Sequence, residues 1–310
     1  MNHQLPPPTH LEYVQYFGPT SERCIEAGCD VVLKRSNSSQ IFSAENLNLI
    51  EQIIENADQD TLVLFDVDQT LITPDDPILK PKYDKLLDDL MGGKKFITDE
   101  SGKTRYIFRE ILMHAPHSLI DPKSLVLVQK LQAKGVPVVA FSAAPGGKIG
   151  EVDSFVDWRI NELHHFGFDF QSIFPHIQTL ELPKDTDLEF PPIYKSGVLI
   201  TSLHDKGPVL LNFFKESNWT PKKVIFIDDQ MSNIRSVIES LEGHTETIGI
   251  HYTGASLIPC ALENKAAKYQ VEHFLKTGNW ISQAEAMIEN EASAVLVPAL
   301  NGAAKTPTRI

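Results

Sequence analysis

Residues 62–72 read LVLFDVDQTLI, an apolar run followed by two aspartates two positions apart. An uninterrupted apolar run of this length is typical of a strand buried on both faces, as in a parallel sheet covered by helices. Ligand sites in such sheets lie just beyond the carboxyl ends of the strands. Taken alone, Asp66 and Asp68 would be better explained as a polar strand exit into a turn, so the rest of the chain must decide their role.

Further apolar segments predict three more strands, at residues 136–141, 224–227 and, more weakly, 247–252. Helical patterns separate them. Alternation of strands and helices predicts an α/β fold, a doubly wound parallel sheet with right-handed crossovers. Before the first strand we expect an N-terminal extension, residues 1–60, that is loosely connected up to residue 42 and then contains one helix, capped by Ser43.

Two long blocks interrupt the expected core, and blocks of this length are too long for ordinary connections. We expect them to form caps over the strand ends. A helical C-terminal extension and a flexible tail follow. The predicted parts are the core at 61–75, 120–145 and 196–255, the first cap insertion at 76–119, the second cap insertion at 146–195, the extension at 256–290 and the tail at 291–310.

Composition limits the classes of function. The 310 residues are 42% hydrophobic, which predicts a soluble globular protein with a sizeable core, and the formal net charge of −13 argues against sequence-independent nucleic-acid binding. We find no signal peptide, no segment of membrane-spanning length and no CxxC pair among the three cysteines. The expected location is the cytoplasm, with export as an effector without a signal peptide left open.

Polar groups follow each of the central strands. Ser142 and Ala143 come after the second strand, Lys206 opens a helical pattern, and Asp228 and Asp229 end the segment KKVIFIDD. A parallel sheet would bring these groups to the same edge as the first aspartate pair. Two carboxylates about 4 Å apart repel by roughly 4 kcal/mol at an effective dielectric near 20. The cluster therefore requires a cation, and a set of oxygen ligands favours Mg²⁺.

The order DxDxT, Ser, Lys, DD resembles the haloacid dehalogenase-like superfamily of phosphotransferases, over about residues 61–255. The resemblance implies that Asp66 is a nucleophile that forms an aspartyl-phosphate. Asp68 would protonate the leaving oxygen and then activate water. Thr70 would shape the loop after the strand, and Ser142 with the backbone of Ala143 would bind phosphate.

The same resemblance implies a metal site made by Asp66, Asp228 and Asp229, with Asp68 contributing its backbone carbonyl. Lys206 would orient the nucleophile and the phosphate. In IYKSGVLI, Lys195 is a second candidate for this lysine. We favour Lys206, because it opens the crossover helix whereas Lys195 precedes an apolar segment.

Two departures from the family pattern stand out. Gln69 is bulkier than the small residue often found at its position, and Ser232 and Asn233 replace an additional acid after the second aspartate pair. The block from HHFGFDFQSIFP to PPIYKSGVLIT also resembles a poorly characterised branch of the superfamily from intracellular Gram-negative bacteria. That resemblance implies no substrate.

Arginines in the two insertions are candidates for substrate contacts. Arg105, Arg109 or Arg159 could clamp a second anionic group of the substrate with the planar guanidinium fork. A solvated charged face is the alternative for the first two, because acidic residues are interspersed there.

The leading hypothesis is a Mg²⁺-dependent phosphatase that hydrolyses phosphomonoesters, either a phosphorylated small molecule or a phosphoprotein. A phosphotransferase or phosphomutase differs only in the acceptor. A dehalogenase of the same fold would need neither Asp68 nor the acidic pair at Asp228 and Asp229. A non-catalytic protein that binds a partner through its insertions is the remaining alternative.

Overall fold

The structure is a computed structural model that divides into two compact units, residues 1–72 with 119–258 and residues 73–118 with 259–310. It describes residues 39–93, 106–170, 174, 176–185 and 187–291, and the backbone of the short strands at 13–14, 97–98 and 104–105.

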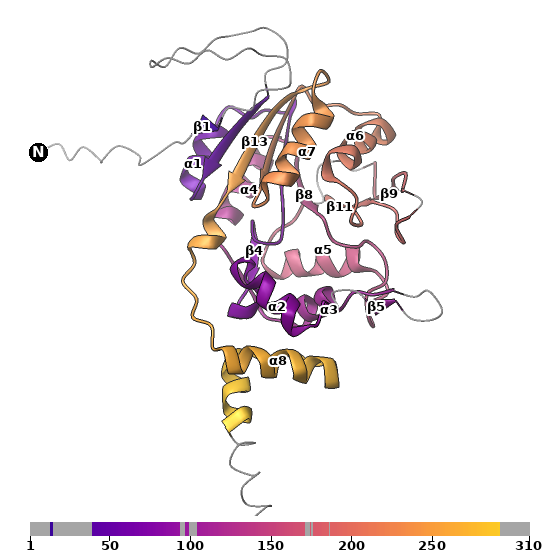
Figure 1. The fold of residues 1–310 in the computed structure, drawn as a ribbon. Coiled ribbons are helices and arrows are strands. Elements are labelled where there is room, and N and C mark those ends of the chain that lie inside the picture. Colours follow the sequence, from indigo (N-terminus) through magenta and orange to yellow (C-terminus); the bar gives the residue numbers. More distant parts are fainter. Residues whose placement is uncertain are drawn as a thin grey trace, which may run out of the picture. The chain divides into compact units, whose positions relative to one another are not determined.

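The first unit is built on a nine-stranded sheet (Figure 1). In spatial order the strands are β1 (Tyr13–Val14), β2 (Gln40–Ala44), β13 (Glu246–Tyr252), β12 (Lys223–Asp228), β3 (Thr61–Phe65), β8 (Val138–Ser142), β11 (Val198–Ile200), β10 (Ile193–Lys195) and β9 (Thr179–Glu181). All neighbours from β2 to β11 are parallel, and the pairs at the two edges are antiparallel. The chain is therefore a mixed α/β protein with a mostly parallel central sheet.

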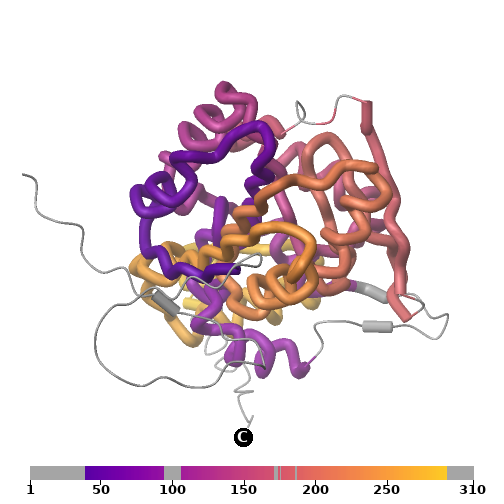
Figure 2. The backbone as a smooth tube through the Cα atoms, turned by 90° about the horizontal axis from the view of Figure 1, so that it is seen from above, coloured from indigo at the N-terminus to yellow at the C-terminus, as the bar shows by residue number. Residues whose placement is uncertain are grey.

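Helices cover both faces of this sheet, which explains its uninterrupted apolar strands. All residues of β3 and β8 are buried. Helices α6 (Lys206–Ser217) and α7 (Met231–Leu241) share one core cluster with alternate residues of β3, β8 and β12. Helices α1 (Leu47–Ile53) and α4 (Lys123–Ala133) lie on the opposite face (Figures 1 and 2). The strand pattern thus led to the correct layering.

The N-terminal extension differs from its prediction. Residues that we expected to be a loose connection form β2, which adds a parallel strand beside β13. Ser43 lies inside this strand, and the cap of α1 is Asn46, whose side chain accepts a hydrogen bond from Leu49 N at 3.3 Å. The short segment QIFSA has too few apolar residues to show a strand period, so its place in the sheet depends on the neighbour.

The second insertion is also corrected, because much of it belongs to the first unit. Residues 146–195 contain α5 (Phe155–His165) and the strands β9 and β10, which extend the central sheet. Phe174, Leu182 and Tyr194 are buried in the core cluster under α6 and α7. Because these apolar side chains are buried in the main core, the segment does not form a separate cap unit.

The second unit joins the first insertion to the C-terminal extension, which we had predicted as separate parts. Its elements are η1 (Pro77–Leu79), η2 (Pro81–Tyr83), α2 (Asp84–Leu90), β5 (Ile97–Thr98), β6 (Thr104–Arg105), α3 (Ile107–His114) and α8 (Asn264–Thr277). The paired strands β4 (Ile72–Pro74) and β7 (His117–Leu119) contain the two points at which the chain passes between the units. Ile107, Ile111, Val271 and Phe274 share one apolar cluster. Buried Asp76 adds a polar tie, because it accepts hydrogen bonds from Trp280 Nε1 at 2.7 Å and from Gln283 N at 2.8 Å.

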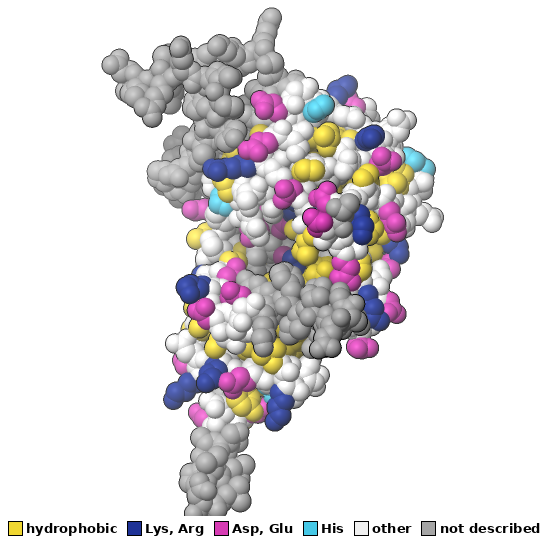
Figure 3. Space-filling view, turned by 45° about the vertical axis from the view of Figure 1, so that its right-hand side comes forward, with side chains coloured by type: hydrophobic (Ala, Val, Ile, Leu, Met, Phe, Trp, Pro, Cys, Tyr) yellow, Lys and Arg dark blue, Asp and Glu magenta, His cyan; other side chains and the backbone are white. Residues whose placement is uncertain are grey.

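Charged side chains of both signs are interspersed over the face drawn in Figure 3. No described helix combines the length and the hydrophobicity that a membrane span requires.

Candidate functional site

The carboxyl ends of β3, β8 and β12 meet where the strand order reverses. The chain runs from β3 to β8 and β11 on one side, and then crosses to β12 and β13 on the other side of β3. Phe65 is paired with Ile227, and Asp66 N donates a hydrogen bond to Ile227 O at 2.8 Å, so Asp66 and Asp228 leave neighbouring strands together. A reversal of strand order in a parallel sheet opens a crevice at the strand ends.

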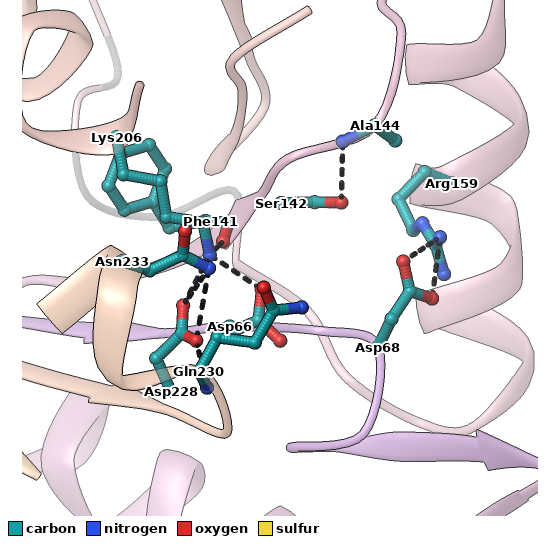
Figure 4. A network of polar contacts seen from close by, with 10 residues as sticks. All are labelled: Asp66, Asp68, Phe141, Ser142, Ala144, Arg159, Lys206, Asp228, Gln230 and Asn233. Carbon is teal, nitrogen blue, oxygen red and sulfur yellow. Dashed lines mark hydrogen bonds and ion pairs between the residues drawn. The ribbon is translucent and has the colours of Figure 1, made fainter. Parts of the chain in front are cut away.

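Lys206 joins these strand ends. It is the first residue of α6, and its Nζ donates to Asp66 Oδ1 at 2.6 Å, to Asp228 Oδ2 at 2.7 Å and to Phe141 O at 2.6 Å (Figure 4). The rings of Phe141 and Phe226 flank the ammonium, with centroids 5.0 Å and 5.1 Å from Nζ. Burial by itself lowers the pKa of Lys206, but the two aspartates outweigh burial and hold that pKa above its ordinary value. The two aspartates therefore favour the charged form of the lysine that bridges them.

Asp66, Asp228 and Asp229 form a compact group of carboxylates. One oxygen of each lies within 4.8 Å of the others. Burial, with repulsion between these groups, raises the pKa of Asp66 to about 7 and that of Asp229 to about 8. One ammonium therefore does not compensate the negative charge of the group. A set of oxygen donors with excess negative charge fits a divalent cation such as Mg²⁺.

Asp228 is held in place by its own turn. Its Oδ1 accepts hydrogen bonds from Gln230 N at 2.7 Å and from Asn233 Nδ2 at 3.1 Å, and Nδ2 also lies 3.1 Å from Oδ2 (Figure 4). The amide of Asn233 orients this carboxylate, whereas from the sequence we expected only that Asn233 replaces an acid. The spacing could have indicated the contact, because a residue five positions after a strand end lies in the first turn of the following helix, here α7.

Ser142 is the last residue of β8 and is buried, and its Oγ accepts a hydrogen bond from Ala144 N at 3.4 Å. Ala143 is partly exposed beside it. The turn after β3 contains Thr70, whose buried Oγ1 has no hydrogen-bond partner among the described residues. Gln69 adopts the left-handed conformation in this turn, with φ of 67°. A non-glycine residue there costs roughly 1–2 kcal/mol, which the surrounding hydrogen bonds must offset.

The Asp68 carboxylate points away from Lys206 and toward α5 (Figure 4). Nη2 of Arg159 donates to its Oδ1 at 2.8 Å and to its Oδ2 at 3.0 Å. Arg159 is 2% exposed, whereas Asp68 is 25% exposed, so the arginine is the fixed partner. The sequence did not indicate this ion pair.

The remaining candidates lie elsewhere. Lys195 forms a partly exposed ion pair with Asp157 at 2.6 Å, so Lys206 rather than Lys195 contacts Asp66 and Asp228. Arg109 belongs to the second unit, where its guanidinium lies over the ring of Phe108. The side chain of Arg105 lies outside the described residues. Among the three arginines, only Arg159 is described within the unit that holds the site.

These features define a mixed α/β protein with a buried lysine and carboxylate cluster at the ends of a mostly parallel sheet. The chain belongs to the family described as "Protein of unknown function (DUF2608)", which matches residues 43–287.

Several bacterial proteins are similar to this chain. An uncharacterized protein of Rickettsia prowazekii is 22% identical over 261 residues, which cover 81% of this chain and 91% of that protein. A second uncharacterized protein, from Rickettsia bellii, is 26% identical over 68% of this chain and 76% of its own length. A Chlamydia pneumoniae protein that carries the name "Putative outer membrane protein" is 24% identical over 57% of this chain and 59% of its own length.

Proposed function

We propose that this chain is a Mg²⁺-dependent phosphatase of the haloacid dehalogenase-like superfamily, which hydrolyses a phosphomonoester through an aspartyl-phosphate intermediate. The observation that carries the proposal is the buried bridge from Lys206 to Asp66 and Asp228 at neighbouring strand ends. Attack of a carboxylate on a phosphoryl group brings two anions together, and fixed positive charge is what lowers that barrier.

Asp66 is suited to be the nucleophile because Lys206 holds its Oδ1, which leaves Oδ2 to attack phosphorus. The bond from phosphorus to the ester oxygen breaks in this first step, and that oxygen takes a proton from Asp68. A water then attacks the aspartyl-phosphate and gives its proton to Asp68, and release of inorganic phosphate restores the Asp66 carboxylate. In each half-reaction, therefore, Asp66 carries the phosphoryl group and Asp68 gives or takes the proton.

Asp66, Asp228 and Asp229 would hold the Mg²⁺, which supplies positive charge for the phosphoryl oxygens and lowers the raised pKa values of its ligands. Asn233 and Gln230 support this role, because they keep Asp228 oriented toward the cluster. Ser142 ends the adjacent strand β8, and its hydroxyl would donate a hydrogen bond to the phosphate.

Phosphoryl transfer to an organic acceptor is the second candidate, since the same residues would form the intermediate and an alcohol would replace water. A partner-binding protein without catalysis is a weaker candidate. Burying two carboxylates around one lysine, with a third carboxylate beside them, destabilises a fold, so such a cluster is better explained by a functional role.

Hydrolysis of an aryl phosphate with Mg²⁺, with and without EDTA, tests the proposal. We expect turnover that depends on Mg²⁺ and that falls by at least roughly 10³-fold in Asp66→Asn. Asp60→Asn, at a partly exposed position just before the same strand, is the matched control and should retain activity. Equal turnover by wild type and Asp66→Asn would refute the nucleophile assignment, and adding an alcohol acceptor would distinguish transfer from hydrolysis by its phosphorylated product.

The location of the protein, in the cytoplasm or exported without a signal peptide, stays a prediction. Fractionation of cells that express the full chain, with the protein detected in soluble, membrane and medium fractions, tests it.

A further inference from the structure

Arg159 is a buried guanidinium whose hydrogen bonds are incomplete. Its Nη2 contacts both oxygens of Asp68, and its Nη1 pairs with Glu162. Its Nε is buried and has no hydrogen-bond partner within the described residues. The rings of Phe155 and Trp158 lie against the guanidinium, with centroids 5.2 Å and 5.4 Å from Cζ, and hold its plane in place.

Asp68 contacts only one of the two guanidinium nitrogens that can bind an anion together. Nε and Nη2 of a guanidinium lie side by side and bind the two oxygens of one anion in parallel. Asp68 occupies Nη2 with both of its oxygens and leaves the Nε–H unmatched. A buried charged N–H without an acceptor is unfavourable, so an anion that engages both nitrogens has an advantage over Asp68.

The ion pair also conflicts with the proposed role of Asp68. Both Asp68 oxygens accept hydrogen bonds from Arg159, so the carboxyl group is held at the guanidinium and neither oxygen is turned toward a leaving group at Asp66. It is directed toward α5 and away from the Lys206 cluster (Figure 4). Productive turnover therefore requires Asp68 to leave Arg159.

Arg159 contacts the turn that follows the nucleophile. It holds Asp68, which comes two residues after Asp66 at the end of β3, and Figure 4 shows these residues at one edge of the sheet. A substrate whose phosphoryl group lies at Asp66 could therefore place a second anion at Arg159.

We propose that the substrate carries a second anionic group, a carboxylate or a second phosphate, which binds Nε and Nη2 of Arg159, displaces Asp68 and so releases the general acid. This inference rests on the proposed phosphatase function and names its substrate class, short phosphomonoesters with a second anion. Arg159 is then a specificity-determining residue, and it acts on the chemical step by positioning Asp68. Phosphomonoesters without a second anionic group bind at Asp66 but leave Asp68 held by Arg159.

Matched substrates test this assignment. The probes are ω-carboxyalkyl phosphates with two to four methylene groups, their neutral amides, and alkanediyl bisphosphates, which distinguish a carboxylate from a phosphate as the second anion. With wild type we expect the best anionic probe to exceed its neutral partner by at least tenfold in kcat/KM, with a substantial part of the difference in kcat. A preference that lies only in KM would overturn the release of Asp68.

Variants separate recognition from a structural role. Arg159→Lys keeps a charge but lacks the two-nitrogen edge, and it should lose most of the preference. Arg159→Gln no longer holds Asp68 with a charged pair, so its kcat for the neutral amide should exceed that of wild type. A structural role would instead lower turnover of both probes alike, which would overturn the proposal. Lys148→Met removes an exposed cation paired with Asp153 in the same segment and should keep the preference.

Trp158 provides a readout that does not depend on turnover or on the glutamine variant folding. An ω-carboxyalkyl phosphonate should change the Trp158 fluorescence of wild type, whereas an alkyl phosphonate at the same concentration should not. Arg159→Lys should abolish the change, and Trp158→Phe assigns the signal. If aryl phosphate hydrolysis depends on Asp66 but neither the kinetic preference nor the fluorescence change is seen, this inference is wrong and the phosphatase function stands. If no phosphomonoester is hydrolysed, both are wrong.

Discussion

Lys206 Nζ lies 2.6 Å from Oδ1 of Asp66, although 140 positions of sequence separate the two residues. The contact exists because β3 lies between β8 and β12, and because α6 begins with Lys206 at the same edge of the sheet. Both side chains are buried, and Lys206 is also paired with Asp228, so one ammonium is shared by two buried carboxylates. Most properties of the site follow from this dependence.

Replacing Lys206 should be far more costly than replacing Lys195. Lys206→Met leaves Asp66 and Asp228 without their buried cation, and breaking such a pair costs about 3–5 kcal/mol. Lys195→Met breaks only a partly exposed pair with Asp157, with an expected cost of about 1 kcal/mol or less. Urea denaturation of the metal-free proteins measures both. Similar losses in the two variants would contradict the central place given to Lys206.

Mg²⁺ should stabilise the folded chain by binding the carboxylate group. A ligand present at 100 times its dissociation constant stabilises by about 2.7 kcal/mol, so Tm should rise with Mg²⁺ concentration and fall again with EDTA. Asp228→Asn should remove this response, because it takes away an oxygen ligand and a charge. Asp153→Asn, an exposed aspartate of the same unit, should respond like wild type. A Tm that is independent of Mg²⁺ would exclude a metal site there.

The metal-free protein should lose stability as the pH rises. Burial raises the pKa of Asp66 to about 7 and that of Asp229 to about 8, from ordinary values of 3.8. Carboxyl groups with a raised pKa are protonated more readily in the folded than in the unfolded chain. Their contribution to the stability of the folded state is therefore complete below about pH 4 and is lost as the pH rises through 7 to 8. Thermal unfolding from pH 5 to 9 in EDTA measures the slope. Asp229→Asn should flatten it, and an unchanged slope would count against the assignment.

Removing the proton carrier should trap the intermediate. Asp68→Asn can still form the aspartyl-phosphate from an aryl phosphate, whose leaving group needs little protonation, but its amide cannot take a proton from the attacking water. Intact-protein mass spectrometry should show a phosphorylated species, and rapid-mixing kinetics should show a burst of phenol release. The double variant Asp66→Asn with Asp68→Asn should show neither. Phosphorylation that persists in the double variant would place the covalent bond on another residue.

The position of α6 should depend on Gly207. A Cβ on this residue would lie 2.0 Å from Ser236 O, a backbone atom of α7 that cannot turn aside. Gly207→Ala should therefore separate the helices at a cost of about 1–3 kcal/mol and shift Lys206 away from the aspartates. Glu216→Ala, at an exposed position of the same helix, is the control. Denaturation and aryl phosphatase assays should show paired losses in Gly207→Ala alone.

Most of the central strands could be predicted from the sequence because a strand buried on both faces shows an unbroken apolar run, as in β3 and β12. Strand β2 could not, since its pattern is short and partly polar and its partner β13 follows some two hundred residues later. The second unit was missed for a similar reason. The apolar faces of α3 and α8 are each visible, but their pairing across the chain is not.

The linear sequence is enough to identify the functional groups and their order along the chain: carboxylates at two strand ends, a hydroxyl at a third and a lysine that opens a helix. Local patterns suffice for this, because each group lies next to an element whose own residues define it. Which of these groups are in contact depends instead on the folded structure. It selected Lys206 over Lys195, gave Asn233 to Asp228 and set Arg159 against Asp68, because such contacts depend on strand register and helix packing between distant parts of the chain.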